Sequence, residues 1–199
     1  MSMSACPKVR TAIFGGSFNP LHWGHLRLAR EVLRQGLADE VWLMVSPQNP
    51  LKPSGTLVDE NLRLQMAREA VSCEAGIEAS DFEFGLPRPS YTWHTLCCLR
   101  EAYPDRCFSL LIGADNWALF DRWAHPADIL QMHEVIVYPR EGFPIRPESL
   151  GAKVHLLEAP LFPWSSTMIR ERLMRGEDCS QLLPPSVLAF VHSHGLWQG

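Results

Sequence analysis

The stretch GGSFNPLHWGH occupies residues 15–25 and connects two segments with different hydrophobic periodicity. Before it, Val9–Phe14 is rich in β-branched and aromatic residues, which predicts a strand. After it, apolar residues recur at helical spacing through Gly24–Gly36, which predicts a helix. Two glycines at the end of the strand would let a ligand approach the backbone closely. The segment therefore predicts a strand, a glycine-rich turn and a helix, with a ligand at the turn.

His22 and His25 are three positions apart at the start of that helix, so both are expected on one side of its first turn. Free backbone N–H groups and the helix dipole at such an end favour an anion. Two imidazoles, as donors or cations, suit a phosphate there better than a metal, because no nearby Cys or Asp is spaced to supply a third zinc ligand. The alternative is a glycine-rich turn with two incidental histidines. Neither the dinucleotide fingerprint nor a Walker loop is present, so histidine would replace the lysine of a P-loop.

Strands and helices continue to alternate beyond this segment. The further predicted strands are Val41–Ser46, Ile77–Phe84, Phe108–Ile112, Glu134–Tyr138 and Val154–Leu157. The further predicted helices are Asn61–Val71, Thr92–Ala102, Ser165–Arg175 and Pro184–His194. This order predicts an α/β fold, a Rossmann-like doubly wound parallel sheet with helices on both faces and a small C-terminal helical segment. In such a sheet a ligand lies at the carboxyl ends of the strands, so functional residues are expected just after each strand.

Composition limits the classes of protein that the chain can belong to. The 199 residues are 46% hydrophobic and 20% charged with a net charge of −4, which indicates a single folded domain over residues 1–199. This charge argues against nucleic acid as a partner, and no apolar run is long enough to span a membrane. The start, MSMSACPKVR, has no apolar signal segment, so the six cysteines are expected as reduced thiols in the cytoplasm. Homo-oligomerisation stays open.

Several motifs together resemble one enzyme family. GGSFNPLHWGH resembles the first signature of the HIGH-type nucleotidyltransferases, and SSTMIR at residues 165–170 resembles their second. PSYT at 89–92, GADN at 113–116 and the tail to Trp197 resemble bacterial nicotinate-nucleotide adenylyltransferases, so the resemblance covers the whole chain. It implies adenylyl transfer from ATP to nicotinate mononucleotide, giving deamido-NAD (nicotinate adenine dinucleotide) and pyrophosphate, in NAD biosynthesis. The alternatives are a phosphopantetheine adenylyltransferase-like enzyme and a nucleotide-binding module without catalysis.

The resemblance also implies roles for individual residues. Adenylyl transfer needs positioning and charge neutralisation rather than a side-chain nucleophile. The catalytic residues would be His22, His25, Lys52 and Arg170. ATP would lie against Gly15, Gly16, Ser17, Phe18, His22, His25, Gly113, Asp115, Ser166, Thr167 and Arg170. The nicotinate nucleotide would lie against Asn19, Lys52, Tyr91, Thr92, Trp117, Trp123 and Ala124, with Trp123 stacked on the pyridine ring and N–H groups near Thr92 and Ala124 reading the carboxylate.

Plainer interpretations exist for most of these residues. Serines before a helix are most often N-caps, an aspartate after a strand can cap a helix, and tryptophans are most often core. The remaining histidines are expected at the surface, namely His94, His125, His133, His155, His192 and His194.

Two positions depart from the commoner pattern of the family. Leu51 stands where many relatives carry a histidine, so Lys52 would carry more of the phosphate contact. Asn19 stands where many carry an aspartate, and its neutral amide cannot be an anionic metal ligand. Mg²⁺ is therefore expected to arrive with ATP rather than on a protein side chain.

Overall fold

The computed structural model describes residues 8–47, 57–146 and 150–198. Its strands are β1 (Val9–Gly16), β2 (Glu40–Val45), β3 (Ile77–Ser80), β4 (Arg106–Gly113), β5 (Glu134–Tyr138) and β6 (Val154–Leu156). Its α-helices are α1 (Trp23–Arg34), α2 (Glu60–Val71), α3 (Thr92–Ala102), α4 (Ala114–Trp117), α5 (Pro126–Met132), α6 (Ser166–Met174) and α7 (Pro185–Ser193). Two 3₁₀ turns are η2 (Phe82–Gly85) and η3 (Phe120–Arg122). The predicted catalytic Lys52 and its neighbour Leu51 lie outside the described residues.

The strands form one sheet in the order β3-β2-β1-β4-β5-β6, and every neighbouring pair is parallel. The order reverses at β1, which pairs with β2 on one side and with β4 on the other. The predicted doubly wound α/β sheet is therefore confirmed. The switch point between β1 and β4 lies at the ends of the strands that finish in Gly16 and Gly113, which is where such a sheet binds its ligand.

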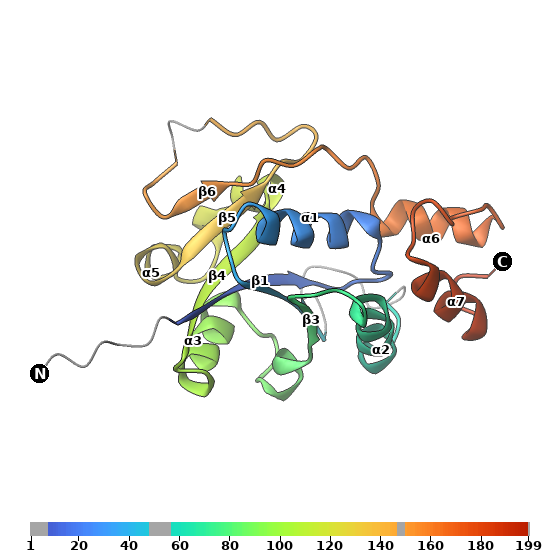
Figure 1. Ribbon diagram of the computed structural model, residues 1–199, viewed down its shortest axis with the longest axis horizontal. Coiled ribbons are helices and arrows are strands. Elements are labelled where there is room, and N and C mark those ends of the chain that lie inside the picture. Colours follow the sequence, from blue (N-terminus) through green and yellow to red (C-terminus); the bar gives the residue numbers. More distant parts are fainter. Residues whose placement is uncertain (1–7, 48–56, 147–149, 199) are drawn as a thin grey trace, which may run out of the picture.

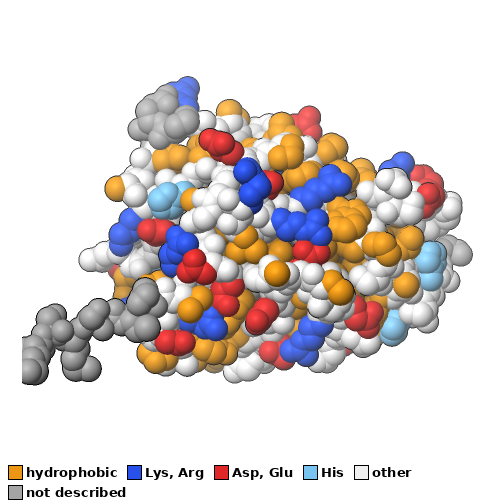
Figure 2. All heavy atoms as spheres, in the orientation of Figure 1, with side chains coloured by type: hydrophobic (Ala, Val, Ile, Leu, Met, Phe, Trp, Pro, Cys, Tyr) orange, Lys and Arg blue, Asp and Glu red, His pale blue; other side chains and the backbone are white. Residues whose placement is uncertain are grey.

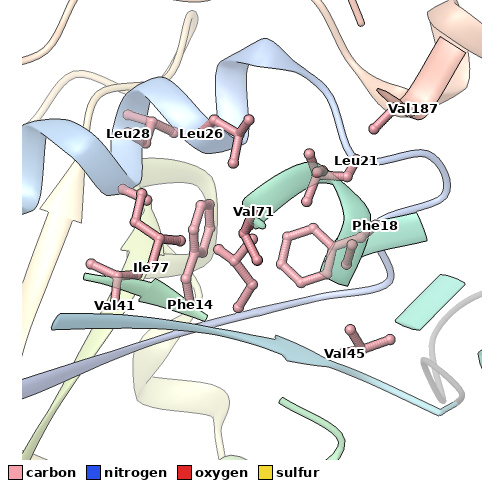
Figure 3. Close-up of a cluster of buried hydrophobic side chains, with 14 of the residues drawn as sticks. Phe14, Phe18, Leu21, Leu26, Leu28, Val41, Val45, Val71, Ile77 and Val187 are labelled. Carbon is pink, nitrogen blue, oxygen red and sulfur yellow. The ribbon is translucent and has the colours of Figure 1, made fainter. Parts of the chain in front are cut away.

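Alternation along the strands sends side chains into two separate cores. Phe14 and Val41 pack with α1, α2 and the C-terminal helices, whereas Ile13 and Trp42 pack with α3 and α5. This pattern follows from the two-residue period of a strand that is buried on both faces. Figure 1 shows α1 and α3 on opposite sides of the sheet. Figure 3 shows part of the first core, in which Phe14 lies below Leu26 and Leu28 of α1 and Phe18 lies below Leu21.

The C-terminal segment packs against the same end of the molecule as the start of α1 (Figure 1). Ile169 of α6 and Val187 of α7 are fully buried in the first core. The backbone N–H of Trp23, at the first turn of α1, donates to the carbonyl of Leu182 over 3.0 Å. These contacts bring residues 165–170 beside the turn after β1, although the two motifs are at opposite ends of the sequence.

Some local predictions were wrong. The single strand expected over Ile77–Phe84 ends at Ser80, and η2 follows it. The chain turns there because Glu83 is buried and accepts a hydrogen bond of 2.9 Å from the Thr95 hydroxyl of α3. His133, expected at the surface, is buried and its Nδ1 lies 2.9 Å from the carbonyl of Phe108.

The surface carries charges of both signs. Figure 2 shows Lys and Arg side chains with Asp and Glu side chains among them across the face in view. Ion pairs include Arg10 with Asp39 at 2.6 Å and Arg30 with Glu74 at 2.5 Å. Within the described ranges, no helix combines the length and the apolar character needed to cross a membrane.

Candidate active site

The turn from β1 into α1 brings His22 and His25 together. Their rings stack with centroids 3.7 Å apart and planes inclined by 26°. His22 is the N-cap residue of α1, and its backbone N–H donates to Nδ1 of His25 over 3.2 Å. The prediction that both histidines lie on one side of the first turn is therefore confirmed. The two side chains and the helix start form one rigid unit at the carboxyl end of β1.

His22 is a neutral residue in this setting. Its side chain is 6% exposed, and burial together with the positive charge of Arg140 lowers its pKa to about 3. Of the two forms expected from the sequence, donor or cation, the structure excludes the cation for His22 at neutral pH. Nδ1 of His22 is buried without a hydrogen-bond partner among the described residues, so this ring keeps an unused polar atom beside the turn.

His25 has a defined tautomer and a fixed orientation. Because Nδ1 accepts the His22 N–H, the neutral ring carries its hydrogen on Nε2. The rings of Phe14 and Phe18 contact His25 edge to face, with centroids 5.8 Å and 5.1 Å away. Nε2–H is therefore a preorganised donor on a half-buried ring.

The glycines of this turn differ in how much space surrounds the position of a Cβ atom. A Cβ on Gly24 would lie 3.0 Å from the His22 ring, and a Cβ on Gly16 would lie 3.1 Å from the Phe18 ring. Gly15 has open space at the same position, as expected for a backbone that a ligand approaches. Phe18 itself is 2% exposed, so its ring belongs to the core and only its backbone could meet ATP.

Anion binding by free N–H groups at the start of α1 is only partly supported. The N–H of His22 is bonded to His25, and the N–H of Trp23 is bonded to the carbonyl of Leu182. In the folded structure, these two N–H groups are therefore not free to bind an anion, although the sequence pattern predicted free N–H groups at this helix end. The partial positive charge of the helix end and the histidine side chains still favour an anion at this position.

The second motif reaches the first through two hydrogen bonds. The Ser166 hydroxyl donates to the carbonyl of Pro20 over 3.0 Å, and Arg170 Nη1 donates to the carbonyl of Asn19 over 2.8 Å. A third contact, 3.3 Å from Arg170 Nη2 to the Thr167 hydroxyl, orients the guanidinium along α6. Burial lowers the pKa of Arg170 without removing its charge. The N-cap of α6 is Ser165, whose hydroxyl accepts from the Met168 N–H, so the N-cap interpretation holds for that serine rather than for Ser166.

Asn19 is a buried framework residue. It is 3% exposed, its side-chain oxygen accepts the Val58 N–H over 3.3 Å, and its carbonyl accepts Arg170. The side-chain amide thus holds the turn to the residues before α2, and the backbone carbonyl holds it to α6. The Asn19 side chain is therefore too buried to make the contact with the nicotinate nucleotide that the sequence analysis predicted.

The end of β4 places Asp115 beside Arg140. Arg140 follows β5, and its Nε lies 3.6 Å from Asp115 Oδ1 while its guanidinium lies over the Tyr138 ring at 5.4 Å. Arg140 Nε and Asp115 Oδ1 are both buried, and neither has a hydrogen-bond partner among the described residues. A Cβ on Gly113 would lie 2.3 Å from Asp115 Oδ1, so any other residue where β4 ends would displace the Asp115 carboxylate. Asp115 and Arg140 therefore stand at the switch point, close enough to His22 for the Arg140 charge to act on its pKa.

The residues assigned to the pyridine ring lie on the opposite side of the sheet from α1. Tyr91 is exposed and precedes α3, and Thr92 begins that helix. Trp93 stacks on His125 with centroids 5.6 Å apart, which brings the start of α3 beside Ala124. Trp123 is half-buried against Phe120 at 5.4 Å. Thr92, Trp123 and Ala124 thus come from two segments that the fold joins.

Trp117 occupies a different environment. It packs on Phe120 at 5.0 Å and lines two cavities of about 310 Å³ and about 560 Å³. The smaller one lies between α4 and residues 142–146, and the larger one lies between α4, α5 and residues 151–154. Trp117 is separated from Trp123 by Phe120, so the two tryptophans do not form one aromatic wall.

Two arginines at the site were missed by the sequence analysis. Arg140 comes two residues after β5, and the rule that functional residues follow strands would have found it. Arg63 is fully buried in α2 and donates to the carbonyls of Ser17 and Pro47, which no periodicity could reveal. In the described part of the chain, no group of three or more His, Cys, Asp or Glu side chains could hold a metal ion.

Comparison with known proteins identifies relatives over nearly the whole chain. The family model described as cytidylyltransferase-like matches residues 13–172. A Bacteroides thetaiotaomicron protein named probable nicotinate-nucleotide adenylyltransferase is 45% identical over 194 residues, covering 98% of this chain and 96% of that protein. A Bacteroides fragilis protein of the same name is 47% identical over 180 residues, covering 90% of each chain.

Solved structures share the fold at lower identity. Plasmodium falciparum nicotinic acid mononucleotide adenylyltransferase complexed with NaAD superposes with a TM-score of 0.78 at 18% identity, covering 95% of this chain and 97% of that one. The same protein complexed with APC gives a TM-score of 0.76 over the same shares. At this identity the likeness shows the architecture alone, over nearly the whole length of both chains.

Proposed function

The chain belongs to the cytidylyltransferase-like family and, within it, to the nicotinate-nucleotide adenylyltransferases, and from this membership we propose how its residues perform the reaction. It transfers the adenylyl group of ATP to nicotinate mononucleotide in NAD biosynthesis. A phosphate oxygen of the mononucleotide attacks the α-phosphorus of ATP. The bond from that phosphorus to the β-phosphate oxygen breaks, so deamido-NAD and pyrophosphate leave. No side chain becomes covalently attached.

The phosphate half of the site is formed by His25, His22 and Arg170. His25 Nε2–H is a fixed donor, and the adjacent end of α1 adds its partial positive charge. Arg170 supplies a full charge from α6 and is held at the same turn by Asn19. Charge that develops on the transferring phosphoryl group would meet these groups without reorganisation, which is how such sites lower a barrier. Ser166, Thr167, Gly15, Gly16 and Ser17 would complete the ATP contacts.

The nucleoside half is formed at the ends of β4 and β5. Asp115 stands where the adenosine would lie, with Arg140 as a second cation near the triphosphate. For the other substrate, Trp123 would offer its ring to the pyridine, and N–H groups around Thr92 and Ala124 would receive the carboxylate. A carboxylate needs donors only, whereas a carboxamide also needs an acceptor, so this pocket would favour the acid.

Mg²⁺ would enter with ATP. The Asp115 carboxylate at the end of β4 is already beside Arg140, and the Asn19 side-chain oxygen accepts the Val58 N–H. The ion would supply further charge neutralisation on the triphosphate. Its ligands would be phosphate oxygens and water, since the described residues offer it no cluster of carboxylates.

One observation carries this assignment most directly. Arg170 donates to the carbonyl of Asn19 over 2.8 Å, which places the only charged residue of SSTMIR at the turn that holds both histidines. A phosphate at this turn would therefore meet donors from both signatures.

The test is pyrophosphate release with ATP and Mg²⁺ and each of three acceptors: nicotinate mononucleotide, nicotinamide mononucleotide and phosphopantetheine. We expect rapid release with the nicotinate form and little with the other two. Equal release with the amide form would remove the carboxylate pocket from the proposal while keeping the enzyme class. Release with phosphopantetheine alone, or ATP binding without release from any acceptor, would overturn it.

A further inference from the structure

The segment between β6 and α6 has no secondary structure of its own. Residues 157–165 form neither helix nor strand, and the prolines at positions 160 and 163 lack a backbone N–H. Ser166, the first residue of α6, follows this segment directly. Because no backbone ladder fixes the course of the segment, its contacts with neighbouring elements must do so. Those contacts therefore help to set where α6 begins.

The first part of this segment is held by Gln35, at the C-terminal end of α1. Nε2 of Gln35 donates to the carbonyl of Glu158 over 2.7 Å, and Oε1 of the same amide accepts the Glu158 N–H over 3.2 Å. One side chain thus pairs with both backbone polar groups of a residue 123 positions away. The planar amide carries its donor and its acceptor side by side, so the pair fixes the direction of the chain as well as its distance from α1.

The last part of the segment is held near the other end of α1. The guanidinium carbon of Arg27 lies 5.9 Å from the ring centroid of Phe162 and 5.5 Å from that of Trp164. The centroids of these two rings are 6.1 Å apart. A Cβ on Gly24 would lie 3.7 Å from Cβ of Phe162, which places the segment beside the first turn of α1. Arg27 therefore acts on the residues immediately before α6.

The two sets of contacts make the segment run along α1. The helix has 12 residues, a length of about 18 Å. Residues 158–164 span at most about 25 Å when fully extended, so they cover the helix only as an extended chain. Figure 1 shows this course from β6 along α1 to α6.

α6 carries the donors of the second signature to the first. The side chains of Ser166 and Arg170 donate to the carbonyls of Pro20 and Asn19, within the histidine turn formed by residues 15–25. A shift of the preceding segment along α1 would move both donors relative to that turn. The contacts of α1 with the segment therefore bear on the geometry between the two signatures.

We propose that Gln35 and Arg27 are positioning residues, which hold residues 158–164 along α1 and thereby place the start of α6 at the phosphates of ATP. Both side chains act through the segment and through α6 rather than on a substrate. This role rests on the proposed function, because it assumes that ATP binds between the two signatures.

Arg27→Ala removes the cation from both aromatic rings at an exposed position of α1, where alanine suits a helix. We expect kcat/KM for ATP to fall about threefold to tenfold, the size expected for two cation–π contacts outside a desolvated site. KM for nicotinate mononucleotide should change less than about twofold, because its expected pocket lies on the other side of the sheet from α1. Arg27→Lys keeps a cation over the rings and should recover most of the loss.

Gln35→Ala removes both hydrogen bonds to Glu158 and should lower kcat/KM for ATP by about twofold to fivefold. Because Gln35 and Arg27 hold one segment, their effects should be non-additive in the double alanine variant. Arg34→Ala is the matched control. Arg34 is exposed on the same helix and pairs with Glu31 at 2.7 Å, so its loss should leave all constants at the wild-type values.

Limited proteolysis with chymotrypsin reads the position of the segment without any substrate. This protease takes an aromatic ring into an apolar pocket, so cleavage after Trp164 requires its half-buried ring to leave Arg27. We expect cleavage at this site, located by mass spectrometry, to be about threefold faster or more in Arg27→Ala and in Gln35→Ala. Arg27→Lys and Arg34→Ala should be cleaved at close to the wild-type rate.

Faster cleavage after Trp164 together with a lower kcat/KM for ATP in both alanine variants supports the inference. Faster cleavage with wild-type constants would mean that the contacts hold the segment for stability alone, and unchanged cleavage would mean that they do not hold it. Either result, or equal changes in KM for both substrates, overturns the inference. A wild-type chain that makes no deamido-NAD would instead overturn the proposed function, and the cleavage rates would still show whether Gln35 and Arg27 hold the segment.

Discussion

The Arg170 guanidinium donates a hydrogen bond of 2.8 Å to the backbone carbonyl of Asn19, across 151 positions of sequence. The acceptor lies three residues before His22, so a cation from α6 is fixed at the turn that carries both histidines. The bond also explains why the C-terminal segment matters to a site that is built mainly on β1 and α1. Its loss should separate the two motifs without disturbing the sheet.

We therefore expect Arg170→Ala to lower kcat/KM for ATP by about 10²-fold or more, because a full charge and a fixed donor are removed from the phosphate. Steady-state kinetics with ATP varied would measure it. Arg172→Ala is the matched control, since Arg172 is on the same helix and pairs with Glu177 at 2.7 Å. Similar losses in both variants would show that α6 was disturbed as a whole.

His25→Ala should lower kcat by about 10²–10³-fold while leaving the fold intact, because one preorganised donor to the transferring phosphoryl group is lost. Far-ultraviolet circular dichroism would check the fold, and pyrophosphate release would measure the rate. His192→Ala, at an exposed position on α7, serves as the control. Near-normal turnover in a folded His25→Ala variant would exclude the role given to this ring.

Trp123→Ala should raise KM for nicotinate mononucleotide far more than KM for ATP, since the aromatic face for the pyridine ring is removed. Trp123→Phe keeps an aromatic face and should recover most of the affinity. The two KM values come from varying each substrate at saturating concentrations of the other. Equal changes in both would mean that Trp123, which packs on Phe120, serves the core.

Gly24→Ala should displace the His22 ring, because Gly24 is buried and the added Cβ would lie 3.0 Å from that ring. We expect a loss of stability of about 1–3 kcal/mol, typical of overpacking, together with a lower kcat. Urea denaturation and pyrophosphate release would measure the two effects. Gly151→Ala, where an added Cβ meets nothing within 4 Å, should change neither.

His22 also makes a pH prediction with a definite sign. Burial lowers its pKa from 6.5 to about 3 in the folded protein, so below about pH 6.5 the unfolded chain binds a proton that the folded protein does not. This contribution to stability is present above the unfolded pKa and is lost as the pH falls toward the folded value. Between about pH 6 and about pH 4, the free energy of unfolding should fall less steeply in His22→Gln, by at most about 1.4 kcal/mol per pH unit.

Urea denaturation of both proteins at several pH values would measure the two slopes. His133, whose pKa burial also lowers, is present in both proteins and cancels from the comparison. Identical slopes would mean that His22 takes up a proton as readily in the folded state as in the unfolded chain.

Sequence reasoning succeeded where the pattern was long and local. The β-rich run before Gly15 and the helical spacing after Gly24 predicted β1 and α1, and Thr92–Ala102 matches α3 at both ends. It missed α5, because a helix of seven residues that begins with a proline shows too little periodicity to be recognised. It also extended β3 too far, because the burial of Glu83 depends on Thr95 of another helix.

The amino-acid sequence by itself determined the fold class, the histidine turn and the family, since each follows from short motifs and periodic patterns that are local along the chain. The tertiary structure alone decided how those parts act together. Burial in the folded chain lowers the pKa of His22, so that this ring is neutral. The fold also directs the Trp23 N–H to the carbonyl of Leu182 and the Arg170 guanidinium to the carbonyl of Asn19. It also buried Arg63 against four carbonyls. Protonation, occupied donors and long-range hydrogen bonds depend on neighbours that are distant in sequence, and only the folded chain brings those neighbours together.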